Sequence, residues 1–403
     1  MILTSEAVFG TVRRGLYVGG MLRTLAVENY RSLRRVVMPL RGLNVVTGAN
    51  GSGKSSLYRA LRLLADASRN GAVAALAREG GLGSTLWAGP EFVRTDRPVQ
   101  GTRRMGPVTL RMGFAADDYG YLMDLGLPLP SASMFAKDPE IKRESLWAGP
   151  FLRPAALLVE RVNSQVRIRG EGGGWDRGGP ELQTFDSMLS QFADPQRAPE
   201  LLQVRERMRS WRFYDHLRTD ADAPARQAQV GTRTPVLGPE GADLAAALQT
   251  IQEIGSASAV AEAVDQAFPG SSVEILDNAG RFELAFHQHG LLRPLQGAEL
   301  SDGTLRYLLW VAALLTPRPP ELLVLNEPET SLHPDLLPAL ANLVVTAAKE
   351  TQVIVVTHSR PFTASLQALN DDLHTIELVK DHGATTIAGQ GPLDEPPWKW
   401  PSR

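Results

Sequence analysis

The sequence predicts an α/β fold with a mostly parallel sheet at its core, and three observations support this. The apolar segment 43–47 runs into a glycine-rich turn and then into a helical pattern over 55–67. The runs 322–325 and 353–356 are apolar at every position, as in strands buried on both faces of a parallel sheet. Alternating segments such as 108–114 predict antiparallel strand pairs beside that core.

Length and composition limit the class of protein. The 403 residues are enough for one large domain with an insertion or for two modest domains. Hydrophobic residues make up 43% and charged residues 21%, as in ordinary globular proteins. The chain has no cysteine, which excludes disulfides and thiolate chemistry and fits a reducing compartment. A formal net charge of -2 gives no basic excess, so any contact with nucleic acid must be local.

Membrane and export signals are not recognised in the sequence. No apolar run approaches the roughly 20 residues that span a bilayer, and residues 1–20 lack the apolar centre of a signal peptide. We therefore expect a cytoplasmic protein with no membrane partner.

Changes of pattern divide the chain into parts. The expected order is an N-terminal extension, a first lobe with a β subdomain, a helical insertion, a second lobe and a C-terminal tail, over residues 1–20, 21–180, 181–270, 271–390 and 391–403. Met21 is a candidate for the natural start of the chain. The insertion is predicted from helical spacing over 201–211 and 244–254. The second lobe is predicted to end in a hairpin of segments 375–379 and 385–388.

The glycine-rich turn carries the strongest motif. Its sequence, Gly-Ala-Asn-Gly-Ser-Gly-Lys-Ser, is G-x-x-x-x-G-K-[ST] placed between a strand and a helix. Its glycines let backbone N–H groups turn toward an anion, and the helix N-terminus adds a positive dipole end. Lys54 is expected to reach the β- and γ-phosphates of ATP, and the Ser55 hydroxyl to bind Mg²⁺. The predicted nucleotide-binding residues of this loop are Gly48, Ala49, Asn50, Gly51, Ser52, Gly53, Lys54, Ser55 and Ser56.

An acidic run follows one of the buried strands. Residues 322–329 read Leu-Leu-Val-Leu-Asn-Glu-Pro-Glu, and they place carboxylates at the edge where α/β sheets bind ligands. Glu327 is the candidate general base for the water that attacks the γ-phosphorus, with Glu329 next in line. Taken alone, the run could be an acidic helix cap after a core strand. The glycine-rich phosphate-binding motif, the P-loop, favours the catalytic interpretation.

Two further motifs are weak by themselves. Ser301-Asp-Gly-Thr precedes an apolar helix over 305–315 and is, on its own, an ordinary helix cap. His358 follows the strand 353–356, and a histidine there is more often a surface residue. Both become candidates for a functional role because they follow the P-loop in the sequence.

Together, the P-loop, Ser-Asp-Gly-Thr, strand-Glu and strand-His motifs resemble the ABC-type ATPase superfamily. Within it, the chain resembles the RecF/SMC/OLD branch of predicted AAA-type ATPases. The opening Leu-Ala-Val-Glu-Asn-Tyr-Arg-Ser-Leu (25–33) and Glu-Pro-Glu-Thr-Ser-Leu-His-Pro (327–334) are similar to that branch. The resemblance covers residues 21–64 and 299–379.

The resemblance implies a two-lobed head that hydrolyses ATP to ADP and phosphate, with Mg²⁺, in a head-to-tail homodimer. Ser301 and Gly303 would then bind the γ-phosphate held by the other subunit, and residues 330–334 would form the D-loop. It also implies that His358 is the switch histidine and that Arg31 lies near the nucleotide. The implied partner is a nucleic acid or an effector protein in DNA repair or defence.

Two departures from that family matter. The residue before the catalytic Glu is usually an Asp that supports the water shell of Mg²⁺, and here it is Asn326. The predicted metal residues are therefore Ser55 and Asn326, with weaker metal binding, and Asn326→Asp is expected to strengthen the response to Mg²⁺. The family's Q-loop glutamine is not recognised, although Gln100 and Gln165 are candidates.

The sequence leaves three functions open. The first is an ATP hydrolase, and the second is a nucleotide-gated switch that hydrolyses weakly because of Asn326. The third is the ATPase subunit of a membrane transporter, which the Ser-Leu-His-Pro loop and the missing glutamine disfavour. No sustained heptad pattern predicts the long coiled coils of SMC proteins, and the residues after His358 are too few for the Toprim nuclease domain of OLD proteins. We expect a compact head alone.

Overall fold

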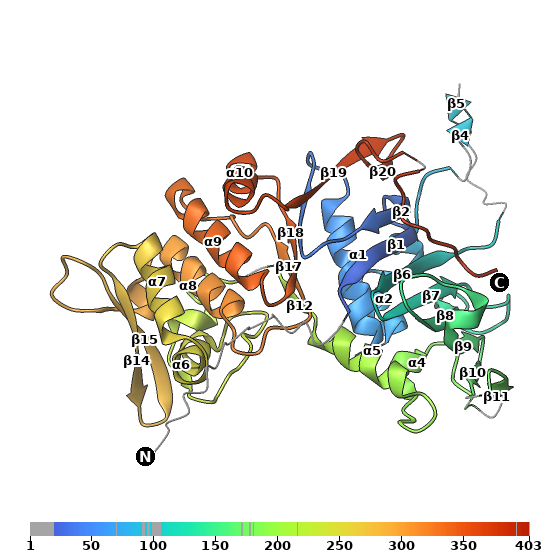
Figure 1. Ribbon diagram of the computed structural model, residues 1–403, viewed down its shortest axis with the longest axis horizontal. Helices are drawn as coiled ribbons and strands as arrows, with labels where there is room; N and C mark the ends of the chain where they lie inside the picture. Colours follow the sequence, from blue (N-terminus) through green and yellow to red (C-terminus); the bar gives the residue numbers. More distant parts are fainter. Residues whose placement is uncertain are drawn as a thin grey trace, which may run out of the picture.

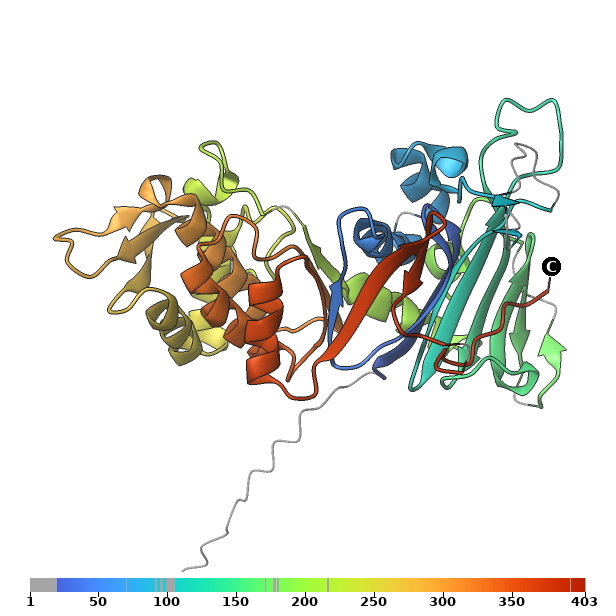
Figure 2. The ribbon, with the colours of Figure 1, turned by 90° about the horizontal axis from the view of Figure 1, so that it is seen from above.

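The computed structural model describes residues 20–69, 71–90, 93–94, 97–98, 106–170, 172–176, 179, 181–215, 217–391 and 393–402. Residues 1–19 of the expected N-terminal extension lie outside this part of the chain. The described molecule is elongated, and a sheet of mainly parallel strands separates two hydrophobic cores (Figures 1 and 2).

The central sheet has the strand order β12-β17-β18-β3-β19-β20, and only β20 runs antiparallel to its neighbour. The strands are Arg212–Tyr214 (β12), Leu322–Asn326 (β17), Gln352–Val356 (β18), Leu43–Thr47 (β3), His374–Asp381 (β19) and Ala384–Ile387 (β20). Along β17, Leu322 and Val324 join one core, whereas Leu323 and Leu325 join the other. Burial on both faces explains the apolar runs 322–325 and 353–356 in β17 and β18.

Helices cover both faces of this sheet. One core includes α1 and α5, at Lys54–Ala67 and Pro199–Ser210. The other includes α6 to α10, at Leu244–Ile254, Ala257–Ala267, Asp302–Leu314, Leu337–Ala347 and Arg360–Leu369. A bilayer-spanning helix is absent from the described residues, since each helix there is too short or too polar.

A second sheet is antiparallel, with the order β11-β10-β9-β8-β7-β6-β1-β2. In that order its strands are Trp175–Asp176, Gln165–Arg169, Leu157–Val162, Glu140–Ala148, Tyr119–Gly126, Leu110–Ala116, Leu22–Tyr30 and Leu33–Pro39. Helix α1 packs against β1 and β6 of this sheet as well as against β17, so it lies between the two sheets. The predicted β subdomain is this sheet.

A smaller sheet lies at the far end of the molecule, beside α6 and α7 (Figure 1). Its strands are Gln229–Val230 (β13), Arg281–His287 (β15), Ser272–Asn278 (β14) and Leu295–Gln296 (β16). The remaining short elements are Ala72–Arg78 (α2), Gly81–Thr85 (α3), Val93–Arg94 (β4), Arg97–Pro98 (β5), Met188–Gln191 (α4) and the 3-10 helices Pro154–Ala156, Pro224–Arg226, Gly297–Glu299 and Pro334–Leu336.

Most of the expected elements are present. The helices predicted over 201–211 and 244–254 are α5 and α6, and the predicted hairpin is β19 with β20. The range 181–270, expected to be helical, also contains β12, an edge strand of the central sheet. Three residues are too few to show a period of two, so this strand could not be predicted from the sequence pattern. The division into lobes and an insertion stays a prediction.

A fully buried ion pair joins two strands of the antiparallel sheet. Arg161 of β9 and Glu144 of β8 have 0% side-chain exposure, and Arg161 Nη1 lies 3.0 Å from Glu144 Oε2. The Met188 N–H donates to the same carboxylate at 2.8 Å, and Arg161 donates to the Gln183 carbonyl at 2.8 Å. The pair therefore ties the sheet to the segment that leads into α4.

Arg161→Ala should lower the free energy of unfolding by about 3–5 kcal/mol, because it leaves the Glu144 carboxylate buried without its cation. Urea denaturation followed by circular dichroism measures this loss. Arg167→Ala is the matched control, since Arg167 is 40% exposed and its partner Glu160 keeps a second cation, Arg143, at 3.5 Å; its loss should cost less than about 1 kcal/mol. Equal losses in the two variants would contradict the role given to the buried pair.

Candidate nucleotide-binding site

The glycine-rich loop 48–53 connects β3 to α1 at the carboxyl edge of the central sheet. Gly48 and Gly53 have φ values of 144° and 114°, which residues with a side chain rarely adopt. A Cβ at Gly53 would lie 2.1 Å from Thr385 Oγ1, and one at Gly48 would lie 2.3 Å from the Leu378 carbonyl oxygen. No side chain caps the N-terminus of α1 in the described structure, so its first N–H groups can bind an anion.

Lys54 is the first residue of α1, its side chain lies against this loop, and it is only 6% exposed. Its Nζ donates to the carbonyls of Gly48 at 2.7 Å and Ala49 at 3.1 Å. Burial lowers the pKa of Lys54, and the carboxylates of Glu327 and Glu329 oppose that shift. The ammonium group is therefore within electrostatic range of both the loop and the acidic residues after β17.

Thr385 of β20 supports the loop from behind. Its hydroxyl donates to the Ser52 carbonyl at 2.7 Å, and its N–H donates to the Ser32 carbonyl at 2.8 Å. The Ser32 hydroxyl lies 2.9 Å from Thr385 Oγ1, and it must be the donor because the Thr385 proton is already used. Thr385 is 1% exposed. No sequence motif indicated Thr385, which lies 333 positions from Ser52.

The predicted catalytic residues meet at the ends of β17 and β18. Glu327 Oε1 is 3.2 Å from His358 Nδ1, and Glu329 Oε1 is 3.9 Å from the same nitrogen. Glu329 has an 8% exposed side chain and accepts a hydrogen bond from the Thr357 hydroxyl, whereas Glu327 is 40% exposed. Glu327 also has a φ of 48°, an unusual backbone conformation that often marks a functional position. Of the two carboxylates, Glu327 is the one open to solvent.

Asn326 has a partner that the sequence did not indicate. Its Nδ2 donates to Asp215 Oδ1 at 2.7 Å. Asp215 follows β12, and only the parallel pairing of β12 with β17 brings the two residues together. No local pattern around Asp215 could have shown this contact.

Arg31, which was predicted to lie near the nucleotide, forms an ion pair within the fold. Its Nη2 lies 2.7 Å from Glu79 Oε2, at the end of α2. The neighbouring Ser32 is the residue that reaches the P-loop helix, with its hydroxyl 3.5 Å from Ser56 Oγ. Gln165 lies in β10, at the opposite end of the antiparallel sheet from β1 and β2, so the sheet does not bring it to the loop. Gln100 lies outside the described residues.

The Ser-Asp-Gly-Thr motif begins α8. The Ser301 hydroxyl accepts a hydrogen bond from the Thr304 N–H at 3.1 Å, and a Cβ at Gly303 would lie 3.5 Å from the Ser331 carbonyl oxygen. Helices α8 and α1 lie on opposite faces of the central sheet (Figure 1). In the described residues, no hydrogen bond or ion pair joins Ser301 or Gly303 to the loop 48–56. Within one chain, the Ser-Asp-Gly-Thr motif and the glycine-rich loop are therefore not in contact.

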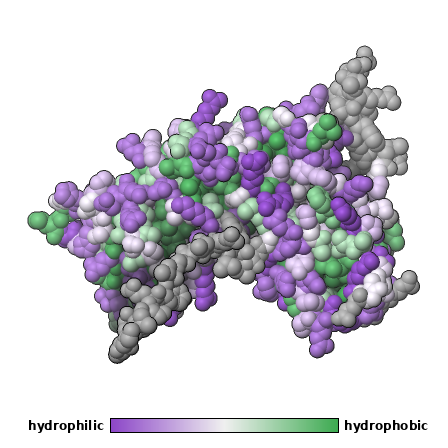
Figure 3. All heavy atoms as spheres, in the orientation of Figure 1, coloured by the Kyte–Doolittle hydropathy of each residue, from purple (hydrophilic) through white to green (hydrophobic). Residues whose placement is uncertain are grey.

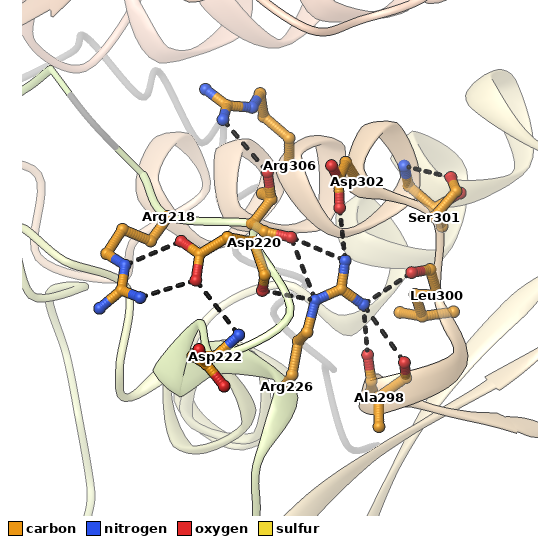
Figure 4. A network of polar contacts seen from close by, with 12 residues as sticks. Arg218, Asp220, Asp222, Arg226, Ala298, Leu300, Ser301, Asp302 and Arg306 are labelled. Atoms are coloured by element: carbon orange, nitrogen blue, oxygen red, sulfur yellow. Dashed lines mark hydrogen bonds and ion pairs between the residues drawn. The ribbon is translucent and has the colours of Figure 1, made fainter.

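Arg226 fixes the segment before α8. Its guanidinium donates to the Leu300 carbonyl at 2.7 Å and to Asp302 Oδ1 at 2.6 Å, and also to the Thr219 carbonyl at 2.7 Å. Figure 4 shows this side chain between the start of α8 and the linker, the segment that joins β12 to α6. The Arg226 side chain is 7% exposed whereas Asp302 is 63% exposed, so the bonds to the Leu300 and Thr219 carbonyls are the ones partly shielded from water.

The fold and the site define a P-loop NTPase. The model of one family, described as "AAA domain, putative AbiEii toxin, Type IV TA system", matches residues 43–365. The chain belongs to this family of AAA-type ATPases. No curated protein matches the sequence.

Solved structures of SMC heads are similar to the chain. One is an SMC head bound to the C-terminal winged-helix domain of ScpA, with 14% identity and a TM-score of 0.50 over 91% of this chain and 97% of that chain. Others are the head with an extended coiled coil from Pyrococcus furiosus (13%, TM-score 0.47, 92% and 96%) and the head from Thermotoga maritima (16%, TM-score 0.41, 91% and 98%). The first of these shows that the chain has the fold of an SMC head, as the resemblance to the RecF/SMC/OLD branch predicted.

Arg226→Ala should loosen the start of α8, because several shielded carbonyls lose their donor at once. Hydrogen exchange over residues 297–304 should become at least about tenfold faster, since that is the effect of about 1.4 kcal/mol on local opening. Arg218→Ala is the control, because Arg218 is 46% exposed and pairs with Asp220 in the same linker. If exchange over 297–304 is the same in the parent and in Arg226→Ala, the network does not hold this segment.

Proposed function

We propose that the chain binds ATP with Mg²⁺ at the loop 48–56 and hydrolyses it in a head-to-tail homodimer. The observation that carries this proposal is the common edge of the central sheet. The anion-binding loop after β3, the acidic residues after β17 and His358 after β18 all lie at this edge. An attacking water, a phosphate chain and a base can therefore meet there.

Each group has a chemical role that fits its surroundings. Lys54 and the N–H groups at the start of α1 would neutralise the phosphate charge. Glu327, the more exposed of the two carboxylates, would accept the proton of the attacking water. His358 would orient Glu327 through their 3.2 Å contact. Glu329, held by Thr357, would instead fix the geometry of this edge.

The oxygen donors at this edge suit Mg²⁺, a hard cation that binds oxygen ligands. The Ser55 side chain is exposed at the start of α1, where it can bind such an ion, and it lies at the same sheet edge as Glu327 and Asp215. When bound, Mg²⁺ would offset the negative charge of the phosphates.

The position of the Ser-Asp-Gly-Thr motif supports the dimer. Ser301 and Gly303 lie on the opposite face of the central sheet from α1, so they would serve the nucleotide of a second copy. The neutral Asn326 favours a second candidate function, a nucleotide-gated switch with weak hydrolysis. In either case we propose that the head drives a nucleic-acid or effector partner in repair or defence, and the toxin named in the family description supports defence.

Glu327→Gln should keep ATP affinity and lower the hydrolysis rate at least about 100-fold, because the amide cannot take the water proton. The closed dimer should accumulate with ATP. Phosphate release and light scattering measure the two effects, and Glu350→Gln, an exposed residue after α9, is the control. Hydrolysis at the parent rate would rule out Glu327 as the base.

Lys54→Ala and Ser301→Arg should each abolish hydrolysis in their own homodimers, since each site takes Lys54 from one chain and Ser301 from the other. Mixing the two variants should restore activity. One site of each mixed dimer is then intact, and random pairing of independent sites gives recovery to about a quarter of the parent rate. Phosphate release and ATP-dependent dimerisation should be followed together. A mixture that neither hydrolyses nor dimerises, with both variants folded, would contradict the head-to-tail arrangement.

A further inference from the structure

An acidic residue outside the predicted motifs lies beside Asn326. Strands β12 and β17 are parallel, with Tyr214 opposite Leu325, so the next residues of the two strands, Asp215 and Asn326, are neighbours at the carboxyl edge. Asn326 Nδ2 donates to Asp215 Oδ1 at 2.7 Å. A hydrogen bond to a carboxylate is stronger than one between neutral groups, so the amide of Asn326 holds one carboxylate oxygen in place.

The contact with Asn326 places the Asp215 carboxylate on the P-loop side of the sheet. Asn326 ends β17 and shares a face with Val324, which belongs to the core that includes α1, and Phe213 of β12 packs against the same core. The Phe213 ring packs edge-on against Tyr58 of α1, with the ring centres 5.8 Å apart. Tyr58 follows Ser55 by three positions and so lies on the same side of α1. The predicted Mg²⁺-binding hydroxyl and the Asp215 carboxylate are therefore on facing surfaces.

The electrostatics of Tyr58 agree with this placement. Burial raises the pKa of Tyr58, and the negative charge of Asp215 raises it further. The Tyr58 hydroxyl is buried and makes no hydrogen bond in the described structure. Asp215 is thus close enough to α1 for its charge to act on the helix that begins at Lys54.

We propose that Asp215 is the carboxylate that supports the water shell of Mg²⁺ in the bound Mg-nucleotide, and that Asn326 is the residue that positions it. This rests on the proposed function of the loop 48–56. In the family that the chain resembles, the acid stands at the position of Asn326; here a neutral residue stands there, and an acid follows the neighbouring strand β12. A carboxylate is therefore still present at this edge, so the neutral Asn326 does not by itself imply weak metal binding.

The proposal reverses an expectation drawn from the sequence. With Asp215 in place, Asn326→Asp would put two carboxylates within hydrogen-bonding distance, and like charges that close disfavour the ionised pair. This single substitution should weaken the response to Mg²⁺. The exchange Asp215→Asn with Asn326→Asp should restore it, because one amide and one carboxylate then face each other again.

The test measures the affinity for a non-hydrolysable ATP analogue by calorimetry, once with Mg²⁺ and once with EDTA. Asp215→Asn should reduce the gain in affinity that Mg²⁺ provides by about 10–100-fold, as for other residues that hold metal ligands in place, and should leave the affinity in EDTA unchanged. The double exchange should recover most of the gain. Asp222→Asn, an exposed residue of the same linker, is the control, and thermal unfolding without nucleotide checks that each variant is folded.

The outcomes separate the possible failures. A parent chain that binds no analogue in either condition would reject the proposed nucleotide site itself. If Asp215→Asn keeps the full gain from Mg²⁺, or loses affinity equally in Mg²⁺ and in EDTA, Asp215 does not act on the metal and the proposal fails. A double exchange that behaves no better than Asp215→Asn, with all variants folded, would also overturn it.

Discussion

The parallel pairing of β17, β18 and β3 is the constraint on which the rest of the structure depends. Parallel strands present their carboxyl ends at one edge, so the residues after these strands must meet there. The pairing holds because each strand is buried on both faces, with Val46, Val324 and Ile354 in one core and Val45, Leu323 and Val353 in the other. The two buried polar side chains at the amino ends of these strands are both hydrogen-bonded, Asn44 to the Arg41 backbone and Gln352 to the Leu22 backbone, because a buried polar group without a partner is costly.

The shape of the P-loop depends on parts of the chain that lie far from it. Thr385 in the last hairpin binds the Ser52 carbonyl, and Ser32 between β1 and β2 binds Thr385. Gly53 must be glycine for two reasons, its positive φ and the closeness of Thr385. Two strands of one sheet and a hairpin of another thus support a loop whose motif is only eight residues long. The buried hydroxyl contacts make that support rigid.

The second half of the proposed composite site is built on a different core. Helix α8 packs with α6, α7 and α9, and Arg226 joins its first residues to a linker that precedes α6. This core also contains Leu43 and Val45 of β3, the strand that leads into the P-loop. Within one chain, packing therefore connects α8 to the P-loop through the central sheet.

The sequence by itself determined the features that are local in the chain. The P-loop, the buried strands, the helices α5 and α6 and the final hairpin follow from spacing and residue type, and the order of the motifs indicated the ATPase head. Tertiary structure alone decided which distant residues contact the candidate site: Asp215 lies 111 positions from Asn326, and Thr385 lies 333 positions from Ser52. The strand β12 is three residues long and carries no recognisable period. The pairing of β12 with β17 forms only when the whole sheet assembles. The contact between Asp215 and Asn326 depends on that pairing, so the residues next to each of them in the sequence do not predict it.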